Sequence, residues 1–192
     1  MPEDLAHLID LFTDSLLLAQ QGLLGQALST LDALLELEPA FLPALAKRAE
    51  LLAQQARFSE ALTSLPAALP DETLGELKAA IREMGEEHCA ARLALDPTDP
   101  AARRERAKLR LADGDLPAAL ADFDAARLSA PTDFELMLLR SNALVGLNRL
   151  DEAEQALLAA LERQPGDPLA LFNLGNVRQF QLRHSEAIAD YE

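Results

Sequence analysis

The chain has 192 residues, a mass of 20.8 kDa and a formal net charge of -15 at pH 7. Leu and Ala, both good helix formers, supply 78 of these residues, whereas Val and Ile together supply five. Because a β-sheet needs β-branched and aromatic side chains to cover its faces, this composition excludes a large sheet and predicts an all-α protein.

Charge and cysteine count also exclude several classes of function. A chain with a pI near 4.5 lacks the positive field that nucleic-acid binding needs. The single cysteine, Cys89, excludes an internal disulfide framework and a multi-cysteine zinc site. The first twenty residues show no basic stretch of a secretory signal, and no apolar run approaches the length that crosses a bilayer. We therefore expect a cytoplasmic protein with no nucleic-acid partner and no membrane partner.

The sequence repeats with a fixed period of about 34 residues. Three prolines are separated by this period, namely Pro97, Pro131 and Pro165. An alanine follows each of them at one constant distance, at Ala119, Ala153 and Ala187. In the first part of the chain, Ala27 and Ala61 are separated by the same period. A fixed period of this length predicts stacked units that bury their apolar faces against each other. In chain order, the expected units of one array over 1–192 are 8–41, 42–70, 100–133, 134–167 and 168–192.

Each unit has the pattern of two short helices. In 134–164, apolar side chains follow helical spacing up to a turn at 146–148, and a second apolar stripe begins at Ala153. Pro165 and Gly166 then end the second helix, because proline supplies no donor and glycine accepts a left-handed cap. Small residues such as Ala119 and Ala153 allow the two helices to approach closely.

The segment 71–99 departs from this period, since the separation of Ala61 and Ala119 falls short of two full periods. Its apolar or small residues recur every three and four positions, which predicts one long helix over 72–95 with Asp71 as its cap (Leu74, Leu77, Ile81, Met84, His88, Ala91, Leu95). A compressed helix pair broken at Gly85 is the alternative. We expect the stripe to pack on flanking repeats rather than to form a coiled-coil seam.

The last unit stops at Glu192, before its second helix would be complete, so its apolar face is left half covered. Natural arrays usually close with a polar capping helix. We expect the sequence to be part of a longer protein; the alternative is a terminus that pairs with another chain.

We find no pattern that predicts catalysis. The sequence has no Ser, His and Asp arrangement, no glycine-rich phosphate loop and no paired-histidine helix motif. Its three histidines are scattered, and none of its carboxylates has a spacing that marks it for acid–base chemistry. We therefore expect no enzymatic activity in this chain, no cofactor and no metal.

The repeat pattern resembles the tetratricopeptide repeat. The likeness is carried by the stretches 114–131 and 148–165 and above all by 172–191, where Leu174, Gly175, Ala187 and Tyr191 stand in the family's positions. The stretches 20–39 and 55–65 also fit. This resemblance implies a right-handed superhelical solenoid of helix–turn–helix units, and a function in binding proteins or peptides.

In this family the first helix of each pair lines a concave groove that holds the ligand. Carried over to this sequence, the resemblance implies a peptide groove formed by Arg104, Lys108, Leu138, Asn142, Phe172, Asn173, Asn176 and Phe180. Asparagine can pair with both polar groups of a peptide backbone. The five basic residues over 103–110 could anchor an acidic peptide, or could pair with acidic neighbours in the array.

The leading hypothesis is a scaffold that captures a peptide or a partner protein in the concave groove. The alternative is the substrate-recognition arm of a larger enzyme, of the glycosyltransferase, sulfotransferase, methyltransferase or aspartyl β-hydroxylase type. A weaker alternative is an oligomerisation module that self-associates through the uncovered C-terminal repeat.

Overall fold

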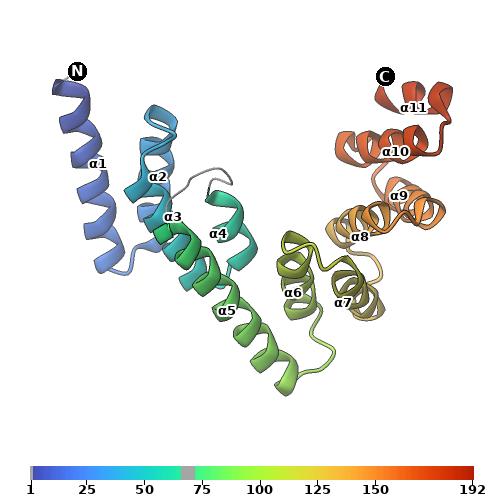
Figure 1. Cartoon of the computed structure of the whole chain (residues 1–192), viewed down its shortest axis with the longest axis horizontal. Helices are drawn as coiled ribbons and strands as arrows, with labels where there is room; N and C mark the ends of the chain where they lie inside the picture. Colours follow the sequence, from blue (N-terminus) through green and yellow to red (C-terminus); the bar gives the residue numbers. More distant parts are fainter. Residues whose placement is uncertain (1, 66–71) are drawn as a thin grey trace. The chain divides into compact units, whose positions relative to one another are not determined.

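A computed structural model of the chain describes residues 2–65 and 72–192 (Figure 1). These residues form eleven α-helices and no strand, which confirms the predicted all-α fold. None of the described helices is long and apolar enough to cross a membrane. The helices are α1 (Pro2–Gln20), α2 (Leu24–Leu37), α3 (Leu42–Gln54), α4 (Phe58–Ser64), α5 (Glu72–Leu95), α6 (Pro100–Ala112), α7 (Leu116–Ser129), α8 (Phe134–Gly146), α9 (Leu150–Arg163), α10 (Pro168–Phe180) and α11 (His184–Tyr191).

The chain divides into two compact units, Met1–His88 and Cys89–Glu192. In the first unit, α1 packs against α2, α2 against α3 and α3 against α4. Leucines from α2 and α3 are fully buried between these helices (Leu31, Leu34, Leu51, Leu52). The rings of Phe12 and Phe41 meet edge to face with their centroids 5.7 Å apart, which ties α1 to the start of α3.

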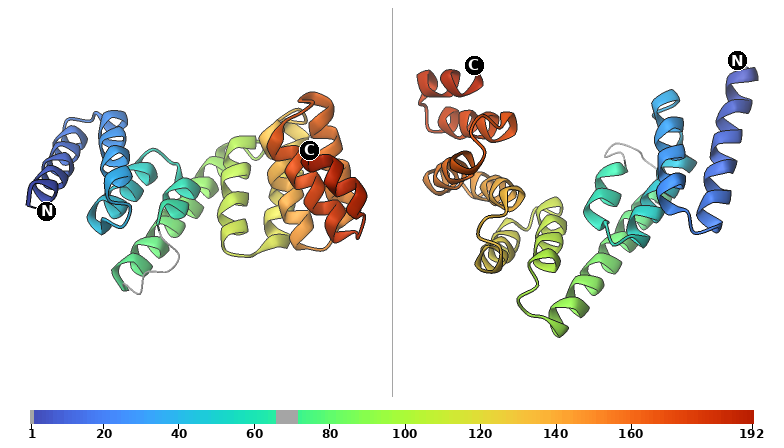
Figure 2. Two further views of the ribbon diagram at one scale, coloured as in Figure 1. Left: turned by 90° about the horizontal axis from the view of Figure 1, so that it is seen from above. Right: turned by 180° about the vertical axis from the view of Figure 1, so that it is seen from behind.

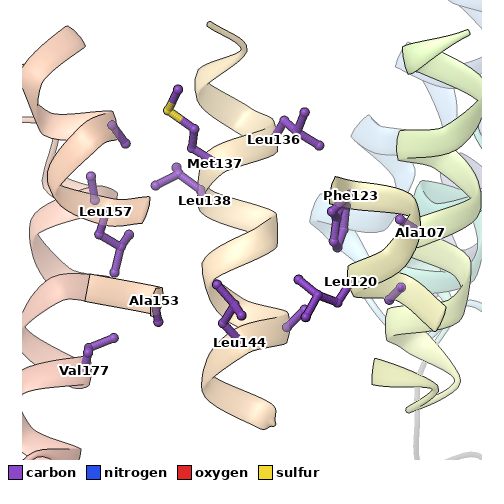
Figure 3. Packing of buried hydrophobic residues seen from close by; sticks show 14 of the residues in the cluster. Ala107, Leu120, Phe123, Leu136, Met137, Leu138, Leu144, Ala153, Leu157 and Val177 are labelled. Carbon is purple, nitrogen blue, oxygen red and sulfur yellow. The ribbon is translucent and has the colours of Figure 1, made fainter. Parts of the chain in front are cut away.

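In the second unit, each helix from α6 to α11 packs against the next one, as the two views of Figure 2 show. The first helices of successive pairs also contact each other, α6 with α8 and α8 with α10. Helix α8 therefore lies in the middle of a continuous core: Leu136 points toward Phe123 of α7, and Leu138 points toward Leu157 of α9 (Figure 3). The division of the whole chain into repeats with the bounds expected above stays a prediction.

Helix α5 confirms the single long helix predicted over 72–95, because it runs through Gly85 without a break. The predicted apolar stripe is wrong in its second half. Ile81, Gly85 and Cys89 are buried, whereas Met84 is exposed and Leu95 is 90% exposed. The buried residues are therefore spaced four apart, so the buried stripe winds gradually around the helix. The predicted alternation of three and four would instead have kept the stripe on one straight face. The predicted cap, Asp71, lies outside the described residues.

A repeated aspartate fixes where the first helices of the second unit begin. Asp99, Asp133 and Asp167 are N-caps of α6, α8 and α10, and each carboxylate accepts a hydrogen bond from a backbone N–H of the helix that follows. Each cap stands two residues after one of the repeated prolines, so the caps share the period of the sequence. A side-chain cap satisfies N–H groups that have no partner within the helix, and removing one typically costs about 1 kcal/mol.

The turn inside each helix pair contains one residue with a left-handed backbone. This residue lies five positions before the repeated alanine in all five pairs, and its φ is between +57° and +79° (Gly22, Ala56, Gly114, Asn148, Leu182). Glycine lacks a Cβ and asparagine can hydrogen-bond locally, so both accept this conformation, whereas in other residues the Cβ crowds the following carbonyl and strains the backbone. The pairs α3–α4 and α10–α11 therefore carry strain that the other pairs avoid.

We expect Leu182→Gly to raise the free energy of unfolding of the α10–α11 pair by about 0.5–1 kcal/mol. The substitution relieves a left-handed strain of roughly 1–2 kcal/mol, offset in part by the greater entropy of glycine in the unfolded chain. Leu182 is largely exposed, so little packing is lost. Thermal unfolding followed by circular dichroism measures the change. Gly114→Ala is the reverse control: a Cβ there meets no atom within 4 Å, so only strain is added and stability should fall.

Candidate functional site

A cavity of about 150 Å³ lies between α8 and α10, the first helices of two successive pairs. Its walls carry three asparagines, and Leu157 of α9 lies beneath them. The complete lining consists of Ser141, Asn142, Val145, Leu157, Asn173, Asn176, Val177 and Phe180. We call this the asparagine groove. It brings together four of the predicted groove residues, namely Asn142, Asn173, Asn176 and Phe180.

Two of the three asparagine side chains are available for a ligand. Neither Asn142 nor Asn173 hydrogen-bonds through its amide to any other residue in the described part of the chain. Each therefore offers one carbonyl acceptor and two N–H donors to the groove. Because the peptide backbone presents both kinds of group, two free amides on neighbouring helices can pair with an extended chain laid between them.

Asn176 is held by a neighbour from α11. The hydroxyl of Tyr191 donates to Oδ1 of Asn176 at 2.8 Å, which leaves the N–H groups of that amide for other partners. Tyr191 reaches this position because Gly175 has no side chain: a Cβ at Gly175 would overlap the tyrosine ring. Sequence reasoning placed Tyr191 in the repeat pattern but missed this contact, since the two residues belong to different helices.

Apolar groups complete the groove. Phe180 is 63% exposed at the end of α10, and Val145 of α8 is partly exposed, whereas Val177 of α10 is fully buried beneath the surface of the groove. An exposed aromatic ring of this kind can cover an apolar side chain of a ligand and remove it from water. The groove thus combines amide groups for a backbone with an apolar surface for side chains.

Leu138 and Phe172 do not lie in the asparagine groove. Leu138 is only 7% exposed and belongs to the buried cluster around α8, so it offers almost no surface to a ligand. Phe172 stands one period later, at the equivalent position of α10, and is 55% exposed. Its ring lies 5.9 Å from that of Tyr191. Leu138 is covered because α9 and α10 pack next to α8. The helices that follow therefore decide whether this position of the repeat is buried or exposed.

Further apolar side chains of α11 and of the turn before it are also exposed (Leu182, Ile188, Tyr191). Self-association through this repeat stays a prediction.

The two basic residues expected in the groove are engaged within the array. Arg104 pairs with Asp133 at 2.6 Å and with Glu135 at 3.3 Å, and Lys108 pairs with Glu135 at 2.6 Å. These ion pairs join α6 to the start of α8. Asp133 and Glu135 already occupy the positions that the carboxylates of an acidic ligand would take. For Arg104 and Lys108, the structure therefore favours pairing with acidic neighbours over anchoring an acidic peptide.

The remaining basic side chains of α6 converge on one buried carboxylate. Asp122 of α7 is 4% exposed, and three arginines donate to it: Arg106 to both oxygens at 2.7 and 2.8 Å, Arg110 at 2.8 Å and Arg103 at 3.5 Å. A buried charge is stable only when it is paired and hydrogen-bonded in this way. Sequence reasoning missed Asp122, although its place one residue before the buried Phe123 puts it beside the apolar side of α7.

Helix α10, which forms one wall of the asparagine groove, is held by a second ion-pair network. Glu154 of α9 bonds Arg178 at 3.2 Å and Arg183 at 2.6 Å, and Arg178 also bonds Asp190 of α11. The pKa of Glu154 lies below its ordinary value: burial acts to raise it, but hydrogen bonds from Arg183 and Arg178 lower it by more. The ionised carboxylate therefore fixes α9, α10 and α11 as one group.

Over residues 2–65 and 72–192, no group of three or more His, Cys, Asp or Glu side chains has the arrangement of a metal site. The thiol of Cys89 is buried and is not part of a disulfide. The lining of the asparagine groove offers hydrogen bonding by amides and contact by apolar groups.

Comparison with known proteins supports the helical-repeat fold. Residues 110–174, which include most of the asparagine groove, match the tetratricopeptide repeat family. The structure of MamA residues 41 to the end from Desulfovibrio magneticus RS-1 is 18% identical, with a TM-score of 0.55 over 96% of this chain and 90% of that one. YrrB, described as a TPR protein with an unusual peptide-binding site, is also 18% identical, with a TM-score of 0.53 over 94% of this chain and 80% of that one. At these identities the likeness shows the fold alone. No curated protein sequence matches the chain.

Proposed function

We propose that this tetratricopeptide-repeat protein binds an extended peptide segment of a partner protein in the asparagine groove between α8 and α10. The observation that carries the proposal is the pair of free amides, Asn142 and Asn173, on opposite walls of a cavity of about 150 Å³. An unpaired amide that faces a groove is best satisfied by the N–H and C=O groups of a peptide backbone.

The size of the cavity limits what it can hold. A volume of about 150 Å³ is below that of pockets for drug-sized ligands, which are typically about 300–1,000 Å³. It suits one apolar side chain of a peptide, covered by Phe180 and Val145, while the backbone runs past the asparagines. The likeness to YrrB, for which a peptide-binding site is described, supports the same role.

The proposed role is binding, without catalysis. The groove is lined by amides, one hydroxyl and apolar groups, and its described lining contains no titratable side chain. A segment captured here would be held by backbone hydrogen bonds and by one buried side chain, which gives the modest affinity of a scaffold contact.

A random dodecapeptide library displayed on phage tests the proposal. The wild-type protein and the variant Asn142→Ala with Asn173→Ala are used as parallel targets. We expect a set of peptides with a common apolar position to be enriched on the wild type and not on the variant. Enrichment of the same peptides on both targets, or of none on the wild type, would contradict the proposed site.

A further inference from the structure

A second cavity lies between α7 and α9, the second helices of two successive pairs, and it has a volume of about 400 Å³. Three arginines line it, namely Arg127 of α7, Arg140 of α8 and Arg163 of α9. Pro131, Ala156 and Ala159 keep some exposure and add an apolar surface. Met137 of α8 lies almost completely buried beside them, and Glu152 and Glu162 lie on the side of α9. None of these residues lines the asparagine groove. We call this cavity the arginine pocket.

The three arginines have hydrogen-bonding capacity to spare. Arg140 has a side chain that is only 15% exposed, and it uses its Nε alone, which donates to Asp124 at 2.6 Å. Its two terminal amino groups have no acceptor within the described residues. Arg127 and Arg163 form no ion pair with any residue in 2–65 or 72–192. They contrast with the arginines of α6, which are paired with Asp122 and Asp133.

The two glutamates do not cancel this charge. Both oxygens of Glu152 accept hydrogen bonds from Arg149, at 2.7 Å each, so that carboxylate is already compensated. Asp124 compensates Arg140, and Glu162 is the remaining carboxylate of the described lining beside Arg127 and Arg163, so one positive charge is left in surplus. A local surplus of positive charge in a chain of net charge -15 is a feature that an anionic group can recognise.

We infer that the arginine pocket binds an acidic peptide segment of a partner protein, in which a Glu or Asp side chain stands next to an apolar residue. The planar guanidinium presents paired N–H groups that match the two oxygens of a carboxylate. Arg127 and Arg163, which form no ion pair with a described residue, would receive the carboxylate, and the two free terminal amino groups of Arg140 would add to the contact. Pro131, Ala156 and Ala159 would contact the apolar neighbour.

Two matched peptide pools test this inference on the full chain. Both pools contain fluorescein-labelled decapeptides with apolar residues beside the central position, which is Glu in one pool and Gln in the other. Fluorescence anisotropy should show at least fivefold tighter binding of the Glu pool by the wild type. In Arg127→Gln with Arg163→Gln this preference should fall below twofold. Both arginines are exposed, so thermal unfolding of the variant should match the wild type.

Two control variants show whether the preference for Glu arises in this pocket. Lys47→Ala with Arg57→Ala removes the same number of positive charges from the first unit, and should leave the preference for Glu intact. Asn142→Ala with Asn173→Ala alters only the asparagine groove, and should also leave it intact. Equal binding of both pools by the wild type would overturn the inference, as would a preference that survives the arginine substitutions or disappears in the asparagine variant.

Discussion

Asp122→Ala is expected to lower the free energy of unfolding of the second unit by about 3 kcal/mol, the lower end of the range for breaking a buried ion pair. The carboxylate is 4% exposed and receives hydrogen bonds from three arginines of α6. Its removal leaves three positive charges close together without their common anion. These arginines keep partial contact with water, which places the expected loss at the lower end.

Asp124→Ala is the matched control. Asp124 lies two residues further along α7, is 43% exposed and pairs with Arg140 alone. An exposed pair contributes about 0–1 kcal/mol, so this variant should lose less than about 1 kcal/mol. Urea unfolding followed by circular dichroism measures both losses. Similar values for the two variants would show that the arginines of α6 are stabilised mainly by water and not by Asp122.

Asn142→Ala with Asn173→Ala is expected to weaken a peptide held in the asparagine groove at least tenfold. Each amide can form two hydrogen bonds to a peptide backbone, and each bond contributes about 0.5–1.5 kcal/mol. The loss of all four such bonds costs at least about 2 kcal/mol, which exceeds the roughly 1.4 kcal/mol that corresponds to a tenfold change in Kd. Isothermal titration calorimetry with a peptide selected on the wild type measures this change.

Asn148→Gly provides the control for this prediction. Asn148 lies in the turn between α8 and α9, outside the groove, and glycine preserves its left-handed backbone. The Kd of the Asn148→Gly variant for the peptide should equal that of the wild type. Neither Asn142 nor Asn173 bonds another described residue, so the groove variant should unfold at the wild-type temperature. A change in Kd of less than twofold in the groove variant would exclude the two amides as ligands of the backbone.

The repeat and its helices could be predicted because they depend on residues close together in the sequence. The prolines at 97, 131 and 165 mark the ends of helices whatever packs around them, because proline lacks the backbone N–H that a helix needs. Helix α5 could be predicted as one helix since a single glycine weakens a helical stretch but does not end it. The face of α5 that is buried could not be predicted from the same spacing, because burial depends on which helices pack around it.

The same dependence on neighbours limits the prediction of the groove. Asn142, Asn173, Asn176 and Phe180 lie together because α8 and α10 are equivalent helices one period apart. Leu138 and Phe172 occupy equivalent positions, yet one is buried and the other exposed, since within the described residues the pair α10–α11 packs over the first. The partners of Arg104 and Lys108 stand at the start of the next helix pair, and the sequence of α6 does not indicate them.

The most direct test of peptide binding in the asparagine groove uses the four asparagines of the chain, at 142, 148, 173 and 176. Three of them line the groove and the fourth does not. In protein labelled with ¹⁵N only at asparagine, NMR follows each side-chain amide while a selected peptide is added. We predict that the amide signals of Asn142, Asn173 and Asn176 shift as the peptide saturates, whereas those of Asn148 stay in place. Saturating binding with the three groove signals unmoved would contradict the proposed function.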